Sequence, residues 1–131
     1  LIFQYIIFWE MNKVMGITEI NESIKPFLVY EYEDSTSVIM SSVGDYKQNV
    51  FETREEEGFL GNGYDWTSLA EVFLIEKVPH LKNYIDFDPE GDLFCAYSKD
   101  KKHVLEFAKE FYNMCQDEEV MSDLFLKAEL D

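Results

Sequence analysis

The stretch DFDPEGDLF, residues 86–94, has the alternating carboxylates of a calcium-binding loop. An EF-hand loop also needs a bidentate glutamate at its twelfth position and a helix on either side. Counting from Asp86, the twelfth residue is Tyr97, and Pro89 stands inside the loop. We therefore expect no metal site here. The order of residue types at positions 88–91, Asp-Pro-Glu-Gly, instead predicts a type I turn that joins two strands.

Other residue patterns that carry catalysis are missing from the sequence. It has no GxSxG elbow, no HExxH pair and no phosphate-binding glycine loop followed by Lys and Ser or Thr. GNGYDW precedes a predicted helix, but Asp65 at the helix start would repel phosphate. We expect no catalytic residue and no cofactor. A hydrolase that uses clustered carboxylates, such as Asp65 and Glu90, remains a less favoured alternative.

The histidines and cysteines also favour structural roles. His80 follows a proline in a predicted turn, and His103 lies beside two lysines at a helix start, so we expect both imidazoles to be solvated. Cys95 falls within an apolar run, and Cys115 falls on the apolar face of a predicted helix. Both are expected to be small core residues, and a disulfide is not needed in a core of this size. This cysteine usage favours a reducing compartment, and we expect the protein in the cytoplasm.

Charge is the strongest global signal. Asp and Glu number 27 against 11 Lys and Arg, which gives a net charge of −16, and Arg54 is the only arginine. Such a surface repels phosphate, so nucleic acids and anionic membranes are poor partners. A basic macromolecule is a favourable partner, because an opposed field speeds encounter and rejects wrong partners. Acidity that serves only solubility is the alternative.

The length of 131 residues suits one domain. Residues 1–10, LIFQYIIFWE, are an apolar extension that is too short to span a bilayer and lacks the features of a signal peptide. We interpret this segment as either not native or an extra strand. We expect residues 11–131 to form the domain.

Hydrophobic periodicity predicts an α+β fold in which helices pack on one face of an antiparallel sheet. Residues 27–33 and 37–43 read as the strands of a hairpin, and residues 84–87 and 93–97 as those of a second hairpin. Residues 47–53 fit either a third strand or a short helix. Caps at Ser98 or Asp100 begin a helix whose apolar positions are Val104, Phe107, Ala108, Phe111, Tyr112 and Cys115. Asp117 caps a last helix with the stripe Met121, Leu124, Phe125 and Ala128.

The segment EEEGFLGNGYDW, residues 55–66, combines charge, aromatic residues and turn glycines ahead of a helix that we expect to be largely buried. The N-cap of that helix is either Asp65 or Ser68 with Glu71 in a capping box, and Pro79 ends or kinks it. A loop held by a rigid helix is a common place for a binding hot spot. The candidate partner-binding residues are Glu55, Glu56, Glu57, Asn62, Tyr64 and Asp65. The plainer reading gives Asp65 a capping role, Tyr64 and Trp66 core positions, and the glutamates a solvated face.

Three segments in order, EEEGFLGNGYDWTSLAEVFL, IDFDPEGDLFCAYSKD and LEFAKEFYNMC, resemble the bacterial Immunity protein 51 family of polymorphic toxin systems. The resemblance covers residues 38–131, and residues before Met11 do not take part in it. Its turn motif reads D-P-E-A/S-x-M-F in the family, and Gly91 and Leu93 stand at its variable places here.

The resemblance implies a small cytoplasmic antidote that binds and neutralises a cognate secreted toxin and has no catalytic activity. A basic nuclease is one toxin that an acidic surface would suit, because carboxylates can mimic the charge of a phosphate backbone. The alternative from another class is an acidic, non-catalytic adaptor or regulatory domain that binds some other basic protein.

Overall fold

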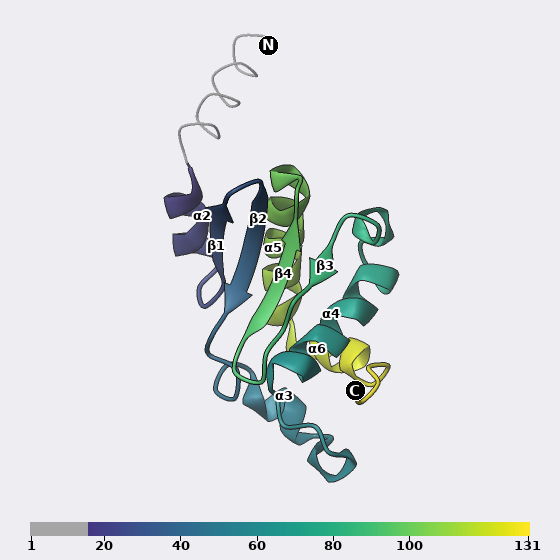
Figure 1. Cartoon of the computed structure of the whole chain (residues 1–131). Coiled ribbons are helices and arrows are strands. Elements are labelled where there is room, and N and C mark those ends of the chain that lie inside the picture. Colours follow the sequence, from purple (N-terminus) through teal and green to yellow (C-terminus); the bar gives the residue numbers. More distant parts are fainter. Residues whose placement is uncertain (1–15) are drawn as a thin grey trace.

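The fold is an antiparallel sheet with helices packed on one of its faces, as the sequence predicts (Figure 1). The computed structural model describes residues 16–131, so the predicted extension at residues 1–10 lies outside the described residues. The sheet has the strand order β1-β2-β4-β3. The described elements are α2 (Ile17–Ser23), β1 (Leu28–Tyr32), β2 (Ser35–Met40), α3 (Gln48–Glu52), η1 (Glu55–Glu57), α4 (Gly63–Glu76), η2 (Pro79–Leu81), β3 (Asp86–Phe87), β4 (Phe94–Ser98), α5 (Lys101–Gln116) and α6 (Glu118–Phe125).

The first predicted hairpin is confirmed. β1 and β2 pair antiparallel, with Tyr32 opposite Ser35, so that Glu33 and Asp34 form a two-residue turn. Glu33 adopts a positive φ of 55°, which hairpin turns of this length commonly require. Polar residues at the turn therefore fix the register of both strands.

The second hairpin is confirmed, but its turn lies two residues later than predicted. Glu90 N–H donates to Leu93 O at 2.9 Å and Leu93 N–H donates back to Glu90 O at 3.2 Å, which leaves Gly91 and Asp92 at the tip. The predicted turn at residues 88–91 is wrong because the ladder continues past β3. Pro89 fits in this extension because β3 is an edge strand and no hydrogen bond from that residue is needed.

Helix α4 begins earlier than predicted, and its cap is Asn62. The Asn62 side chain accepts from Asp65 N–H at 2.9 Å, and the Asp65 carboxylate accepts from Asn62 N–H at 3.4 Å. This is a capping box in which aspartate takes the place usually held by Glu or Gln. The predicted caps at Asp65 and at Ser68 are therefore wrong: Asp65 is the third helical residue, and Ser68 lies in the second turn.

The other helices settle the remaining sequence predictions. Residues 48–52 form the short helix α3 instead of a strand. Helix α4 ends at Glu76, and Pro79 opens the short 3-10 helix η2. The caps of α5 and α6 are Asp100 and Asp117, as predicted. Ala128, predicted on the apolar stripe of α6, lies beyond the end of that helix but is buried.

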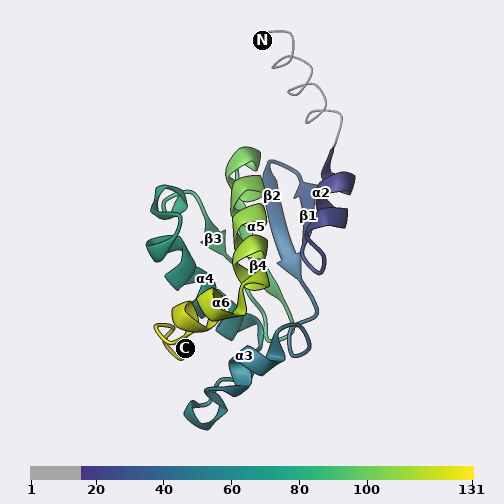
Figure 2. The same ribbon diagram turned by 180° about the vertical axis from the view of Figure 1, so that it is seen from behind.

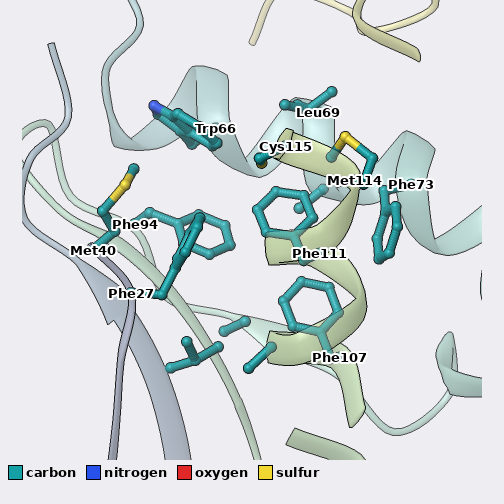
Figure 3. Packing of buried hydrophobic residues seen from close by; sticks show 14 of the residues in the cluster. Phe27, Met40, Trp66, Leu69, Phe73, Phe94, Phe107, Phe111, Met114 and Cys115 are labelled. Carbon is teal, nitrogen blue, oxygen red and sulfur yellow. The ribbon is translucent and has the colours of Figure 1, made fainter. Parts of the chain in front are cut away.

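The core lies between the sheet and the helices, and aromatic rings fill its centre (Figure 3). Phe111 of α5 lies at its centre: the ring stacks on Phe94 at a centroid distance of 5.5 Å and on Phe107 at 5.2 Å. Phe27 and Trp66 meet the same ring edge-on, at 5.7 and 6.1 Å. Each of these five side chains is at most 2% exposed. The predicted burial of α4 is confirmed, and α5 joins α4 to the sheet through one ring.

Replacing Phe111 with alanine should remove this shared ring and leave a cavity that its rigid neighbours cannot fill. We expect the free energy of unfolding to fall by about 3–5 kcal/mol. Urea denaturation followed by tryptophan fluorescence measures the change. Asn113→Ala, at an exposed position of the same helix, is the control and should change the value by less than about 0.5 kcal/mol. A loss below about 1 kcal/mol for Phe111→Ala would contradict this account of the core.

Both cysteines are free and buried, as predicted, but they lie on different sides of the sheet. Cys115 is inside the core cluster on α5. Cys95 pairs with Ile39 in the sheet register and points away from the helices. Burial raises the pKa of the Cys115 thiol from 9.0 to about 12, with a small opposite effect from Lys47. The folded protein therefore keeps this thiol neutral well into the alkaline range.

This raised pKa predicts a loss of stability above pH 9. The unfolded thiol ionises near 9.0 while the folded thiol holds its proton until about 12, so the stabilisation is complete below pH 9 and falls as pH rises. Between pH 7.5 and 10.5 the wild type should lose about 2 kcal/mol more than Cys115→Ala. Urea denaturation at both pH values tests this. Equal losses in the two proteins would contradict it.

Candidate partner-binding surface

The segment that contains the six predicted binding residues lies at one end of the molecule and comprises η1, the loop after it and the first turn of α4 (Figure 1). Their side chains differ in accessibility. Glu55, Glu56 and Glu57 are exposed, and Tyr64 is 42% exposed. Asn62 is half-buried, and Asp65 is only 3% exposed. The segment therefore contains residues that can meet a partner and residues that hold the loop in shape.

Arg54, the only arginine in the sequence, connects the acidic run at residues 55–57 to other segments of the chain. Its guanidinium donates two hydrogen bonds to the Glu57 carboxylate, both at 2.8 Å. Its Nη1 donates to Phe125 O at 2.6 Å and to Ala128 O at 2.8 Å, near the end of the chain. The group also lies over the Phe59 ring, 4.4 Å from its centroid. One side chain thus joins η1, the following loop and the C-terminal segment.

The pairing with Arg54 favours the ionised form of the Glu57 carboxyl group. The hydrogen bonds from Arg54 hold the pKa of Glu57 below its usual value, and the same bonds raise the pKa of Arg54. Glu57 is therefore committed to an internal partner. Within residues 16–131, no ion pair engages Glu55 or Glu56. These two carboxylates are the ones in the run that remain available to a binding partner.

Asp65 shapes the loop from inside. Its Oδ2 accepts from Leu60 N–H at 2.7 Å and from Gly61 N–H at 2.8 Å, in addition to the longer bond from Asn62. Gly61 has a φ of 75°, a conformation that other residues rarely adopt. A buried carboxylate that accepts backbone N–H groups at a helix start also benefits from the helix dipole. Asp65 therefore acts as a structural anchor, and Tyr64 beside it projects outward.

Gly63 explains how the loop meets the second hairpin. Its N–H donates to Gly91 O at 3.1 Å. A Cβ atom at this position would lie 1.9 Å from Glu90 O and 2.2 Å from Leu93 O, so no larger residue fits. The start of α4 is therefore pressed directly against the tip of the β3–β4 hairpin.

Among the shallow grooves of the described surface, two are lined by carboxylates. One, of about 330 Å³, lies at the candidate surface and is lined by Gly58, Asn62, Tyr64, Asp65, Leu130 and Asp131. The other, of about 470 Å³, lies between α2 and α5. Glu106 lines it, and this carboxylate is paired with His80 Nε2 at 2.5 Å. The buried hydrogen bonds of Asp65 also argue against the hydrolase that would use it with Glu90.

One histidine prediction is wrong. His80 is 60% exposed, but the His103 side chain is only 16% exposed. The His103 ring stacks on Tyr84 with a centroid distance of 4.0 Å, and its Nε2 lies 3.4 Å from Asp100 Oδ2. Sequence reasoning missed this burial because Tyr84 comes from a distant segment. The ring and the carboxylate together stabilise the start of α5.

Within residues 16–131, no three His, Cys, Asp or Glu side chains gather in a way that could hold a metal ion. In the same part of the chain, no helix combines the length and the apolar character needed to cross a membrane.

A comparison with protein families finds a match over residues 27–130 to the family described as Immunity protein 51. The chain belongs to the Immunity protein 51 family. The match starts at the first hairpin, earlier than the resemblance at residues 38–131 suggested. No match is found among curated proteins or among solved structures. Membership in Immunity protein 51 indicates an immunity protein of a toxin system, whose partner is a cognate toxin protein.

The structural role of Asp65 can be tested by comparison with Glu55, an exposed residue of the same segment. Asp65→Ala removes the acceptor for three backbone N–H groups and should lower the free energy of unfolding by about 2–3 kcal/mol. Glu55→Ala, in the same segment but with no ion pair among the residues that the structure describes, should change it by less than about 0.5 kcal/mol. Urea denaturation of both variants gives the comparison. Similar values for the two would contradict the anchoring role of Asp65.

Proposed function

We propose that this protein neutralises its cognate toxin by one-to-one binding that occludes the active site of the toxin or an essential surface. It acts in the cytoplasm and performs no turnover of its own. The observation that carries the proposal is the family match over most of the chain. The toxin is expected to be the product of the neighbouring gene.

The contact surface proposed for the toxin is the segment with Glu55, Glu56, Glu57, Asn62, Tyr64 and Asp65. Its side chains divide into two roles. Glu55, Glu56 and Tyr64 touch the toxin, because they are exposed. Glu57, Asn62 and Asp65 hold the loop in the binding conformation through Arg54 and through the cap of α4. A loop preorganised in this way loses little conformational entropy on binding.

The chemistry of the surface favours a basic toxin, and a basic nuclease is the proposed class. A net charge of −16 attracts a cationic partner at long range. Carboxylates at a cationic cleft occupy the positions that phosphates of a nucleic acid would take. Binding there would keep the substrate out without any chemical change to the toxin.

Co-expression tests the function directly. The toxic domain from the neighbouring gene is induced in cells with and without this protein, and survival is scored. Survival only in its presence is the expected result. Equal death in both cultures, with the protein soluble and abundant, would overturn the proposal.

Charge reversal tests the electrostatic part of the proposal. Glu55→Lys with Glu56→Lys should slow association with the toxin by about tenfold or more at low salt, since steering depends on local charge. The control is Glu19→Lys with Glu110→Lys, which makes the same change in net charge in the α2–α5 groove. Stopped-flow measurements at rising ionic strength should show the rate of the wild type converge on that of the variant. A wild-type rate that is indifferent to salt would rule out steering.

A further inference from the structure

The face of the sheet opposite the helices carries exposed aromatic and apolar side chains. Val29 of β1 points into the core, so its neighbours Leu28, Tyr30 and Tyr32 point the other way. These three are 46%, 40% and 67% exposed. Figure 1 shows α5 behind the sheet and Figure 2 shows it in front, so the described helices leave this face open.

The strand register adds further residues to the same face. Tyr30 and Tyr97 both stand opposite Ser37, one on each side of β2. Ser37 is only 8% exposed although no described helix covers it. The two tyrosines flank it on the open face, and we call Tyr30, Tyr32 and Tyr97 the aromatic strip.

The calcium-like spacing of residues 86–90 has its explanation here. Asp86 stands opposite Tyr97, and Asp88 N–H donates to Cys95 O at 3.0 Å. Because side chains alternate along a strand, Asp86, Asp88 and Glu90 all project on the open face. Phe87 between them points inward and contacts the Phe94 ring. The three exposed carboxylates form a row along the edge of the aromatic strip.

A second observation places Asp88 on this face. Burial raises the pKa of the Cys95 thiol, and the charge of Asp88 raises it further. Cys95 is opposite Ile39 on the side of the sheet away from the core cluster. The carboxylate and the thiol are therefore close on the same side.

No positive charge offsets this row within the sheet itself. The four strands and the β3–β4 turn contain no lysine, arginine or histidine. Lys101 at the start of α5 is paired with Glu31 at 2.6 Å, and Glu31 points to the helix side of β1. A surface of tyrosines and of carboxylates that form no ion pair within residues 16–131 suits a partner rich in Lys and Arg, which bind both ring faces and carboxylates.

We infer that the open sheet face, made of Leu28, Tyr30, Tyr32, Tyr97, Asp86, Asp88 and Glu90, binds a lysine- and arginine-rich surface of the cognate toxin. The inference rests on the proposed function and extends its contact surface. The two parts are adjacent, because the hydrogen bond from Gly63 to Gly91 joins the loop before α4 to the tip of the carboxylate row. Exposed tyrosines are favoured anchors in protein interfaces.

Other modes of binding fit this surface less well. A second copy of the chain would bring one carboxylate row against another, at a net charge of −16 per chain. Strand addition at the β1 edge is blocked by Asn21, whose side chain donates to Val29 O at 2.9 Å and accepts from Val29 N–H at 2.7 Å. The face is therefore a better place for a partner than the edge.

Isothermal titration of the purified toxin domain tests the inference with two independent variants. Tyr30→Ala with Tyr32→Ala removes the aromatic anchors, and Asp86→Asn with Asp88→Asn removes charge at almost constant shape. Each should weaken binding by about tenfold or more. The controls are Ile75→Ala, at an exposed apolar position near the end of α4 that is remote from the hairpin tip, and Glu19→Gln with Glu110→Gln. Both should stay within about twofold of the wild type.

The outcomes distinguish the inference about the open sheet face from the proposed function. If the wild type binds and both face variants bind within twofold of it, the open face is not a contact surface and the inference is overturned, while the proposed function stands. If the wild type does not bind the toxin at all, both are overturned. If the tyrosine variant fails to fold, as circular dichroism would show, the asparagine variant decides alone.

Discussion

The aromatic packing around Phe111 is the constraint on which the rest of the described structure depends. Rings from the chain before β1, from α4, from β4 and from α5 meet there, so the helices are drawn to one face of the sheet. Once those rings are buried, the outward positions of the same strands are free to carry residues that the core does not need. The exposed tyrosines and the carboxylate row occupy such positions. The core thereby determines which face of the sheet the described helices leave exposed.

Charged residues follow the same division. Asp65 and Arg54 are both largely buried. Both side chains form hydrogen bonds with backbone atoms, and Arg54 also donates to Glu57. Buried charges persist only when they are paired or fully hydrogen-bonded. Their contacts hold a loop in place. Glu55, Glu56 and the carboxylates of the open face remain in solvent, where a charge has no desolvation cost and can attract a partner. The acidic residues thus fall into two groups: buried ones that hold the structure together, and exposed ones that are free to attract a partner.

Sequence reasoning succeeded where the determinant is local. The periodicity of α5 and α6, the two hairpins and the caps at Asp100 and Asp117 each follow from a few neighbouring residues. It failed where two local signals compete, as at the start of α4, where Asn62 and Asp65 are both good caps and together form a capping box. The Pro-Gly signal misplaced the second turn because the extent of the ladder is not visible in a turn motif.

The remaining features depend on contacts between distant segments. Arg54 is 71 positions from Phe125, whose carbonyl it binds, and the half-buried His103 ring stacks on Tyr84. The open sheet face can be recognised only when the register places Tyr30, Ser37 and Tyr97 side by side. Sequence spacing showed that the carboxylates at residues 86–90 alternate, but only the structure shows which side of the sheet they share.

We propose that the protein blocks its toxin by binding it one to one. This proposal is tested most directly by titrating the activity of a fixed amount of purified toxin with increasing amounts of this protein. Under tight binding, toxin activity should fall linearly and reach zero at one equivalent. Complete loss of activity at a small fraction of an equivalent would indicate turnover, and full activity at a large excess would show that no blocking complex forms; either result would contradict the account.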